Sequence, residues 1–468
     1  MNTAAAIFVA AALLVSAGIA QAGQDDDADL IPRTAPAAAA ATPAAGDGAG
    51  QKVYLENAMT EVADSSGLAV PLPPPPGYLW QERLLLDARA DRALGEQSEF
   101  HLSDRLNLRD EDDLSFPNHE DIVNDLREAY ISWHTADRFY LDAGRINLKS
   151  GIALGYNPSD FFKTRSVTEP LSNDPSVLRE DRLGTVMLRG QGIWESGSLT
   201  VAFAPALHRR SAIYSNDDLP SFDPMFDRTN SADRFLIKGS LDFGRGASPE
   251  FLLYREAGET HLGSNLSLGL GQSTVAYLEW SGAERPGLIT EALDYGRETG
   301  SLPAAAPDPV PATANKTFKS EFALGASYTT ADDVTFNVEY LVNQAGFSRT
   351  DWNDWFAAGT EPNPPPGLID ELWYIRAYAR DQQQQNTRQA YFARADWADA
   401  FGAKLELSAF TLIDAYDRSG VAQVAADFYL SDSWTLGAQA LKYFGSRRSD
   451  FGSLGTSYSL LFDISHYF

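Results

Sequence analysis

Residues 80–91 read WQERLLLDARAD, and polar and apolar side chains alternate through this stretch. The even-numbered positions are apolar apart from Glu82, and the odd-numbered positions are polar apart from Leu85. Successive side chains of a β-strand point to opposite faces. The stretch therefore predicts a strand with one apolar face and one charged face.

The same period of two returns in several later segments of the chain. It is clearest in residues 234–242, 334–340, 404–409 and 434–441. Each run belongs to a segment of about ten residues, which is the length that crosses a bilayer as a tilted strand. Soluble β-sandwiches alternate in this way too, so alternation alone leaves both classes open.

The connections between these segments distinguish the two classes, because short and long connections largely alternate along the chain. Short ones occur near residues 93–97, 135–137, 195–197, 244–248, 271–273, 330–332, 398–402 and 431–432, and long ones near 109–122, 150–183, 208–231, 284–316 and 345–385. Two further connections, around Ala257 and Ala415, break the pattern by being short. Short turns on one side and long loops on the other are typical of membrane barrels. We therefore expect an all-β chain that forms a transmembrane antiparallel up-and-down β-barrel with long extracellular loops.

The alternation of short and long connections gives a strand count. Seventeen candidate strands lie between Tyr78 and Phe468, and the turn after the first of them is short. A chain that enters from the periplasm needs an earlier strand before that one, and residues 52 to about 70 are the best place for it. The prediction is a barrel of 18 strands over residues 52–468, with 16 as the alternative, wide enough for an aqueous channel.

The N-terminal region has the composition of an export signal. Residues 4–18 form a short apolar run, and Ala20, Gln21 and Ala22 supply small residues for cleavage, so residues 1–22 are predicted to be a signal peptide. Residues 23–51 are rich in Ala, Pro and Asp and offer few large apolar side chains. We expect them to form a disordered periplasmic segment, with a partner-binding arm as the alternative.

Composition excludes several classes of protein and site. With 37 basic and 64 acidic side chains, the chain carries a net charge of −27, which disfavours a nucleic-acid partner. The absence of cysteine excludes disulfides, thiolate metal sites and a lipidated N-terminal cysteine. A mean hydropathy of −0.27 leaves no room for a bundle of membrane helices.

The C-terminal residues 458–468 read YSLLFDISHYF, with apolar or aromatic side chains at Tyr458, Leu460, Phe462, Ile464 and Phe468. This pattern resembles the last strand of Gram-negative outer-membrane β-barrels of the porin-like class, although His466 departs from it. The resemblance implies an assembly signal for the barrel-assembly machinery, an outer-membrane location, and contact with outer-membrane lipid and lipopolysaccharide. Residues 144–147 (GRIN) and 155–162 (GYNPSDFF) are also similar to segments of large porin and alginate-export-like barrels.

Catalysis receives little support from the sequence. The six histidines are not part of a G-x-S-x-G, H-E-x-x-H or P-loop motif. The acidic runs 111–113 and 351–354 lack the spacing of a calcium loop and are read as solvated loops. We expect no catalytic residues, no metal and no cofactor. In the last of the long loops, Trp352, Trp355 and Phe356 are predicted to form a small core, and residues 368–378 a short amphipathic helix.

The lumen of the barrel is the best place for function. We assume that the alternation decides which side chains point into the lumen. The charged pore-lining candidates are then Arg83, Arg89, Arg105, Arg189, Lys238, Glu279, Glu339, Arg394 and Glu406. Opposed arginines and carboxylates would also stabilise the interior of a barrel. The long loop 150–184 is a candidate constriction or plug, and its charged candidates are Asp160, Lys163, Arg165, Arg179 and Arg182.

These observations predict a passive channel for small hydrophilic solutes rather than an enzyme. A structural barrel that holds a partner, in an export or electron-transfer complex, is the alternative. The sequence leaves the solute, the ion preference and the oligomeric state open.

Overall fold

A computed structural model describes residues 51–65, 67–71, 79–111, 122–135, 138–168, 172–213, 221–242, 247–304, 308–312 and 315–468. The predicted signal peptide and the predicted disordered segment, apart from Gln51, lie outside these residues, and the division of the chain into these segments stays a prediction.

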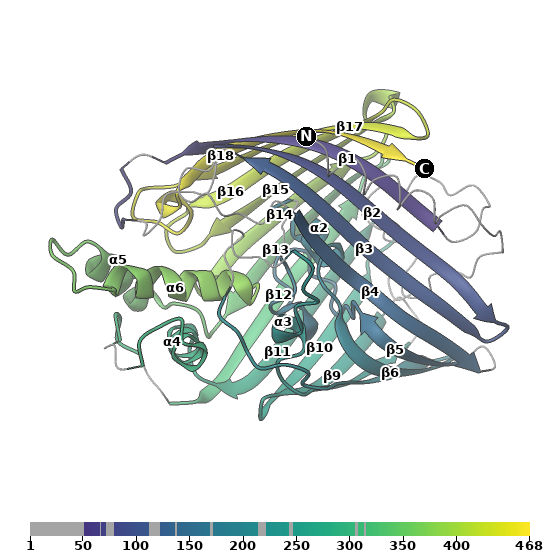
Figure 1. Cartoon of the computed structure of the whole chain (residues 1–468), viewed down its shortest axis with the longest axis horizontal. Coiled ribbons are helices and arrows are strands. Elements are labelled where there is room, and N and C mark those ends of the chain that lie inside the picture. The colour runs from purple at the N-terminus through teal and green to yellow at the C-terminus, as the bar shows by residue number, and fades with distance from the viewer. Residues whose placement is uncertain are drawn as a thin grey trace.

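Eighteen strands follow one another around a single sheet (Figure 1). They are β1 (Gln51–Asp64), β2 (Trp80–Gly95), β3 (Ser98–Glu111), β4 (Ile122–Thr135), β5 (Phe139–Ile146), β6 (Thr185–Trp194), β7 (Gly197–Ala204), β8 (Arg234–Leu241), β9 (Ala247–Glu256), β10 (Glu259–Gly269), β11 (Thr274–Arg285), β12 (Thr317–Thr329), β13 (Val334–Asn343), β14 (Gln389–Trp397), β15 (Leu405–Asp414), β16 (Gly420–Tyr429), β17 (Trp434–Phe444) and β18 (Thr456–Tyr467). Every strand pairs antiparallel with its neighbours in the chain.

Pairing of the first strand with the last closes the sheet. β1 pairs with β2 on one side and with β18 on the other, where Tyr54 lies opposite Tyr467. The Phe468 N–H then donates to the Val53 carbonyl over 3.0 Å. The chain is a closed antiparallel up-and-down barrel, and the prediction of 18 strands is confirmed.

The first strand is shorter than the predicted strand over residues 52 to about 70. β1 ends at Asp64 rather than near residue 70. Val70 is fully buried in an apolar cluster formed by loop helices. Packing against those helices, instead of a ladder partner, determines the position of this residue.

The long connections gather at one end of the barrel, which we call the loop end (Figure 1). The two short connections around Ala257 and Ala415 also lie there, as the exceptions to the predicted pattern, and the other short connections lie at the opposite end, the turn end. The connections contain the helices η2 (Phe161–Lys163), α2 (Pro175–Glu180), α3 (Phe226–Thr229), α4 (Leu288–Thr299), α5 (Arg349–Gly359), α6 (Leu368–Asp381), η4 (Ala400–Gly402) and η5 (Phe451–Ser453). None of the helices in the described ranges has the length and apolarity needed to span a bilayer.

Helices α4, α5 and α6 pack together as a cap at the loop end (Figure 1). Trp352, Trp355 and Phe356 of α5 are buried against Leu372 and Ile375 of α6. A capping box, in which the Ser348 and Asp351 side chains each accept the other residue's N–H, begins α5. The predicted aromatic core and the predicted helix, which extends to Asp381, are confirmed.

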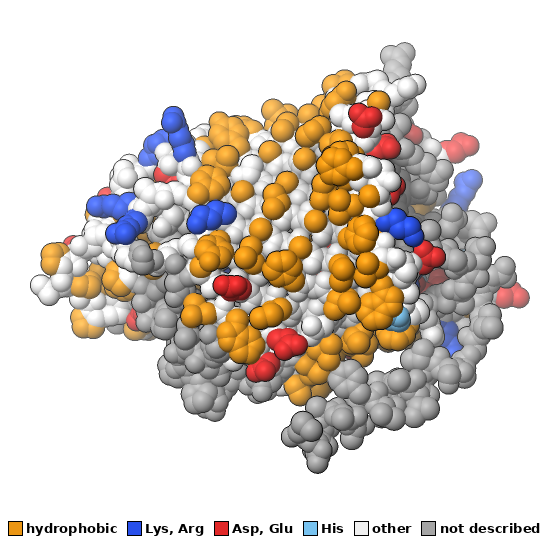
Figure 2. All heavy atoms as spheres, turned by 90° about the horizontal axis from the view of Figure 1, so that it is seen from above, with side chains coloured by type: hydrophobic (Ala, Val, Ile, Leu, Met, Phe, Trp, Pro, Cys, Tyr) orange, Lys and Arg blue, Asp and Glu red, His pale blue; other side chains and the backbone are white. Residues whose placement is uncertain are grey.

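The outer face of the barrel is apolar. Leu324, Val338 and Phe462 are each more than half exposed, and similar side chains form a band over β1, β2, β17 and β18 (Figure 2). The two exceptions in residues 80–91 do not shift the phase of the strand. Leu85 is buried inside, whereas Glu82 stays on the outer face, where its Oε1 accepts from Asn57 Nδ2 at 3.1 Å.

A charge placed on the outer band tests this assignment of faces. Leu324→Arg puts a guanidinium where lipid is expected, and we expect it to lower the free energy of unfolding by about 2–4 kcal/mol. Ser327→Arg, three positions along the same strand on the inner face, is the matched control and should cost far less. Urea titrations of both variants folded in lipid vesicles measure the difference, and equal losses would contradict the assignment.

Candidate functional site

The connection between β5 and β6, which the structure describes over residues 147–168 and 172–184, folds into the barrel and reaches the opposite wall. Its residues contact side chains of β10, β11, β13 and β14, although β5 and β6 lie on the other side of the sheet order. In Figure 1, α2 of this connection lies within the outline of the barrel. We call residues 147–184 the lumen loop.

Two buried carboxylates hold the middle of the lumen loop by its backbone. Glu279 of β11 accepts from the N–H groups of Ile152, Ala153 and Ser159, at 2.9, 2.9 and 2.8 Å. Glu339 of β13 accepts from Leu154 N–H at 2.6 Å and from the next residue's N–H at 2.9 Å. Hydrogen bonds to a charged acceptor are roughly twice as strong as neutral ones. These two glutamates therefore fix the path of the loop across the lumen.

A glycine permits this close approach. Gly151 has φ of +79°, and a Cβ atom on it would lie 2.3 Å from Glu279 Oε1. A larger residue would meet both a strained backbone and the carboxylate.

The C-terminal part of the lumen loop joins a cluster of charges on the wall formed by β2, β3 and β4. Asp181 pairs with Arg105 at 2.9 Å and with Arg127 at 3.3 Å. Both arginines also pair with Asp87, at 2.8 and 2.6 Å. Arg105, Arg127 and Asp87 are at most 2% exposed, so the four charges compensate one another away from water.

On the far wall, the start of α2 is held by Arg394 of β14. The Asp174 side chain caps the helix by accepting the Ser176 N–H at 2.9 Å, and it also pairs with Arg394. Arg394 pairs in addition with Asp396 at 2.7 Å. The short helix α2 is therefore tied to opposite walls at its two ends.

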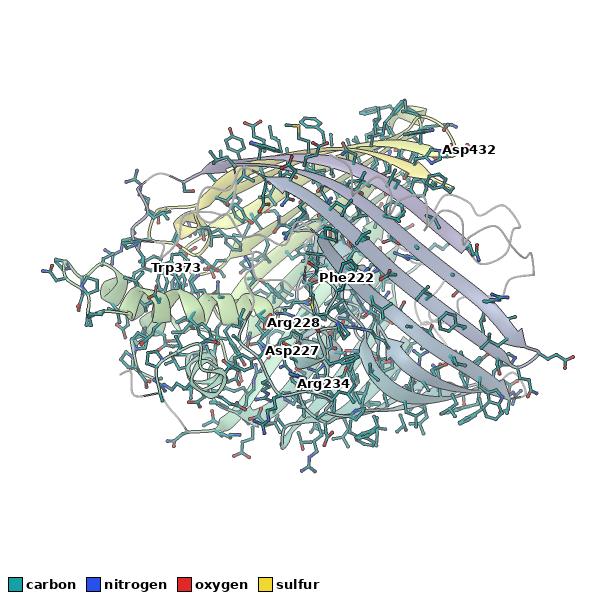
Figure 3. All side chains as sticks on the ribbon, in the orientation of Figure 1. Phe222, Asp227, Arg228, Arg234, Trp373 and Asp432 are labelled. Atoms are coloured by element: carbon teal, nitrogen blue, oxygen red, sulfur yellow. The ribbon has the colours of Figure 1, made fainter. Side chains whose placement is uncertain are left out.

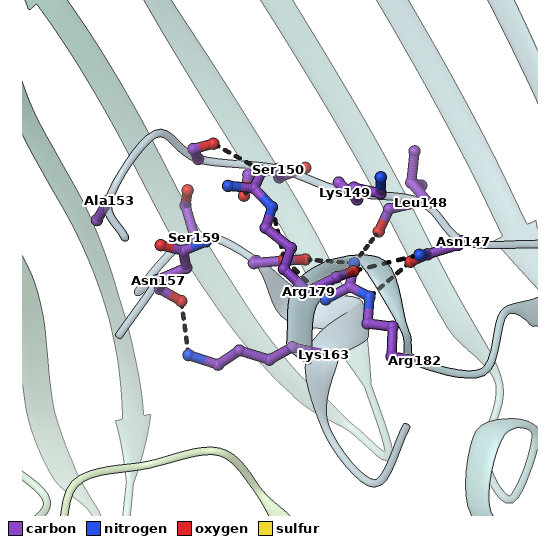
Figure 4. A network of polar contacts seen from close by, with 12 residues as sticks. Asn147, Leu148, Lys149, Ser150, Ala153, Asn157, Ser159, Lys163, Arg179 and Arg182 are labelled. Carbon is purple, nitrogen blue, oxygen red and sulfur yellow. Dashed lines mark hydrogen bonds and ion pairs between the residues drawn. The ribbon is translucent and has the colours of Figure 1, made fainter. Parts of the chain in front are cut away.

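Most of the charged residues predicted in the constriction form ion pairs and hydrogen bonds within the lumen loop itself (Figure 4). Arg182 pairs with Asp160 at 2.8 Å, and Arg179 donates to the carbonyls of Ser150 and Gly151, at 3.1 and 2.8 Å. Lys163 donates to the Asn157 carbonyl at 2.6 Å. Burial lowers the pKa of the Lys163 ammonium below its ordinary value.

Arg165, the fifth of these residues, lies where three loops meet. Its N–H donates to the Asp381 carbonyl at 2.9 Å, and its guanidinium pairs with Glu256 at 3.2 Å. Arg228 of α3 donates to the Arg165 carbonyl at 3.1 Å and pairs with Asp381 at the end of α6 at 2.6 Å. Figure 3 labels Arg228 beside the cap. The lumen loop is thereby joined to the cap through a buried ion pair.

The other predicted pore-lining residues all lie on inward faces of their strands. Arg83 pairs with Glu56 at 2.7 Å, Arg189 with Asp142 at 2.7 Å, Lys238 with Glu250 at 3.4 Å, and Glu406 accepts from the Tyr429 hydroxyl at 2.9 Å. Arg89 differs because its side chain is 49% exposed. Direct contact of these residues with a solute stays a prediction.

Sequence reasoning missed the partners that complete the network. Arg127, Arg228 and Asp381 are not among the predicted residues, and Asp181 is predicted only as one of the charges of the constriction loop. Alternation over 122–135 does not place Arg127, because a register shift at this residue changes the phase of the strand: the exposed Ile131 and Trp133 have odd numbers, as the buried Arg127 has. No pattern in the sequence joins Arg228 to Asp381, because the two residues are 153 positions apart.

Several solved structures are similar to this chain. Pseudomonas aeruginosa OccK8 (OprE) aligns with a TM-score of 0.49 and 10% identity, over 90% of this chain and 98% of that one. Pseudomonas aeruginosa OccK11 (OpdR) aligns with a TM-score of 0.47 and 11% identity, over 89% and 95% of the two chains. Salmonella typhi OmpF, in a complex with daunomycin, aligns with a TM-score of 0.40 and 7% identity, over 89% and 97%. No protein-family model and no curated protein matches the sequence.

Removing the two glutamates should free the lumen loop. In Glu279→Ala/Glu339→Ala, the amides of residues 152–155 and 159 lose charged acceptors, and we expect their exchange protection to fall at least about tenfold. Glu406→Ala, which removes an inward carboxylate that accepts the Tyr429 hydroxyl, is the control. Hydrogen exchange followed by mass spectrometry measures this, and unchanged protection in the double variant would contradict the anchoring role.

Breaking the junction with the cap should destabilise the loop end. Arg228→Gln leaves Asp381 buried without its cation, and we expect a loss of about 3–5 kcal/mol of stability. Lys149→Gln breaks the exposed pair with Glu180 and should cost less than about 1 kcal/mol. Unfolding followed by tryptophan fluorescence compares the two variants, and similar losses would show that the buried pair is unimportant.

Proposed function

We propose that this chain is a porin-like channel of the Gram-negative outer membrane through which small hydrophilic solutes diffuse passively. The observation that carries the proposal is a closed barrel of 18 strands, apolar outside and charged inside, with a loop folded across its lumen. Barrels of this size are wide enough to contain water, and an inward loop narrows the path. In the proposed channel, the loop end faces the outside of the cell and the turn end faces the periplasm.

The lumen loop, on this proposal, limits passage mainly by size. Arg182 and Asp160 neutralise each other, and Arg105 and Arg127 are compensated by Asp87 and Asp181. Paired charges project a weaker field into the path than isolated ones. We infer that the constriction is a steric filter whose position is set by Glu279 and Glu339.

Single-channel recording tests the proposal. The purified protein in a planar bilayer should conduct without a partner, and a variant with residues 152–180 replaced by a short Gly-Ser linker should conduct several-fold more. A barrel that stays sealed in both forms would contradict the channel and favour the partner-holding barrel. Equal conductance of the two forms would contradict the lumen loop as the constriction.

A further inference from the structure

A crevice lies where three segments of the chain meet at the loop end. Residues 156–163 of the lumen loop form one side, the loop-end parts of β12 and β13 form the second, and residues 383–385, which follow α6, form the third. The empty space, counted out to its open mouth, is about 240 Å³. Four of the side chains that line it are amides, so we call it the amide crevice.

Three of these amides have buried atoms without a hydrogen-bond partner in the described part of the chain. The atoms are Nδ2 of Asn343, Oε1 of Gln384, and both Nε2 and Oε1 of Gln385. Asn343 and Gln385 are only 3% and 5% exposed. A buried polar group that lacks a partner is costly. The amide crevice therefore has bonding groups that a ligand can satisfy.

The turn after α6 places two of these amides. Gln383 has φ of +51°, a region that residues other than glycine rarely adopt. Its side chain donates to the Lys163 carbonyl at 2.7 Å, and the next N–H, that of Gln384, donates to the Ala379 carbonyl at 2.8 Å. The chain thus leaves the helix in a fixed direction, with Gln384 and Gln385 lining the crevice.

The lining carries no net charge. Glu321 of β12 pairs with Arg285 of β11. On the opposite side, the Lys163 ammonium donates to the Asn157 carbonyl at 2.6 Å (Figure 4). One negative and one positive charge are therefore both held by other groups of the chain. The unpartnered groups are neutral amides, which suit a neutral ligand.

The enclosed part of the amide crevice admits only a small group. The centre of a water-sized sphere can move through about 10 Å³ of it, which is the space of one water molecule. Gln385 offers a donor and an acceptor there, so the entering group must also donate and accept. A hydroxyl group does both at this size, whereas an ether oxygen only accepts and an ammonium only donates.

We propose that the amide crevice binds a hydroxyl group of a neutral polyhydroxylated solute, such as a polyol or a sugar. The hydroxyl donates to the Oε1 atoms of Gln384 and Gln385 and accepts from Nδ2 of Asn343. A site built to bond a hydroxyl rejects an analogue that lacks one, because the amides are then left without partners. This names a class of solute for the channel, and it rests on the proposed function.

Saturation-transfer NMR with erythritol and the full-length protein, in a detergent without sugar headgroups, tests the proposal. Asn343→Ala/Gln385→Met replaces two of the amides by apolar groups and should weaken binding at least about tenfold. The control, Asn337→Ala/Gln423→Met, removes the same two kinds of amide from buried positions on the wall outside the crevice. It should bind erythritol as the unaltered protein does.

The outcomes separate the alternatives. 1,2-Dimethoxyethane, which accepts hydrogen bonds but has no hydroxyl group, should give no saturable signal. Equal affinity of the two double variants would overturn the proposal, as would an erythritol signal that does not saturate, which would mean that water alone fills the crevice. Heat-modified migration on gels checks that each variant is folded. Conductance is recorded in parallel: saturable binding without conductance supports the amide crevice and refutes the channel, and conductance without binding does the reverse.

Discussion

Closure of the sheet by the pairing of β1 with β18 is the constraint on which the rest of the structure depends. In lipid, an unpaired backbone N–H or carbonyl group has no water to bind, so an open edge would be costly along its whole length. Ten consecutive pairs, from Tyr54 opposite Tyr467 to Ala63 opposite Tyr458, and one further pair beyond a register shift, Asp64 opposite Thr456, remove both edges at once. The outer side chains can then be mostly apolar, because the strands need no hydrogen bonds from their surroundings.

Closure also creates an interior that the strands alone cannot fill. Eighteen strands enclose more space than their inward side chains occupy, and the lumen loop extends into it. Buried charges are stable only when they are paired or hydrogen-bonded. This explains why Glu279 and Glu339 accept backbone N–H groups, and why Asp87 and Asp181 share Arg105 and Arg127. The wall and the loop are thus one polar network, in which the charges compensate each other and the loop takes a single path.

The loop end combines two environments. Inside, Arg228 and Asp381 join the lumen loop to the helical cap, whose aromatic core surrounds Trp355. Outside, the Lys442 ammonium lies 5.6 Å from the ring of Tyr458, at the edge of the apolar band. The β15–β16 and β17–β18 connections share hydrogen bonds, so a substitution in one of these connections should also shift the other.

Local patterns in the sequence determined the barrel. These patterns are the period of two, the lengths of the connections and the terminal aromatic strand, and each of them depends only on residues that are close together in the chain. They placed nine charged residues on the inner face and one loop in the lumen. Only the tertiary structure decided what those charges do. Asp174 meets Arg394, and Asp381 meets Arg228, across more than 150 residues of chain. No local pattern records such pairings, since they arise when the closed wall brings distant loops together and requires each buried charge to find its partner.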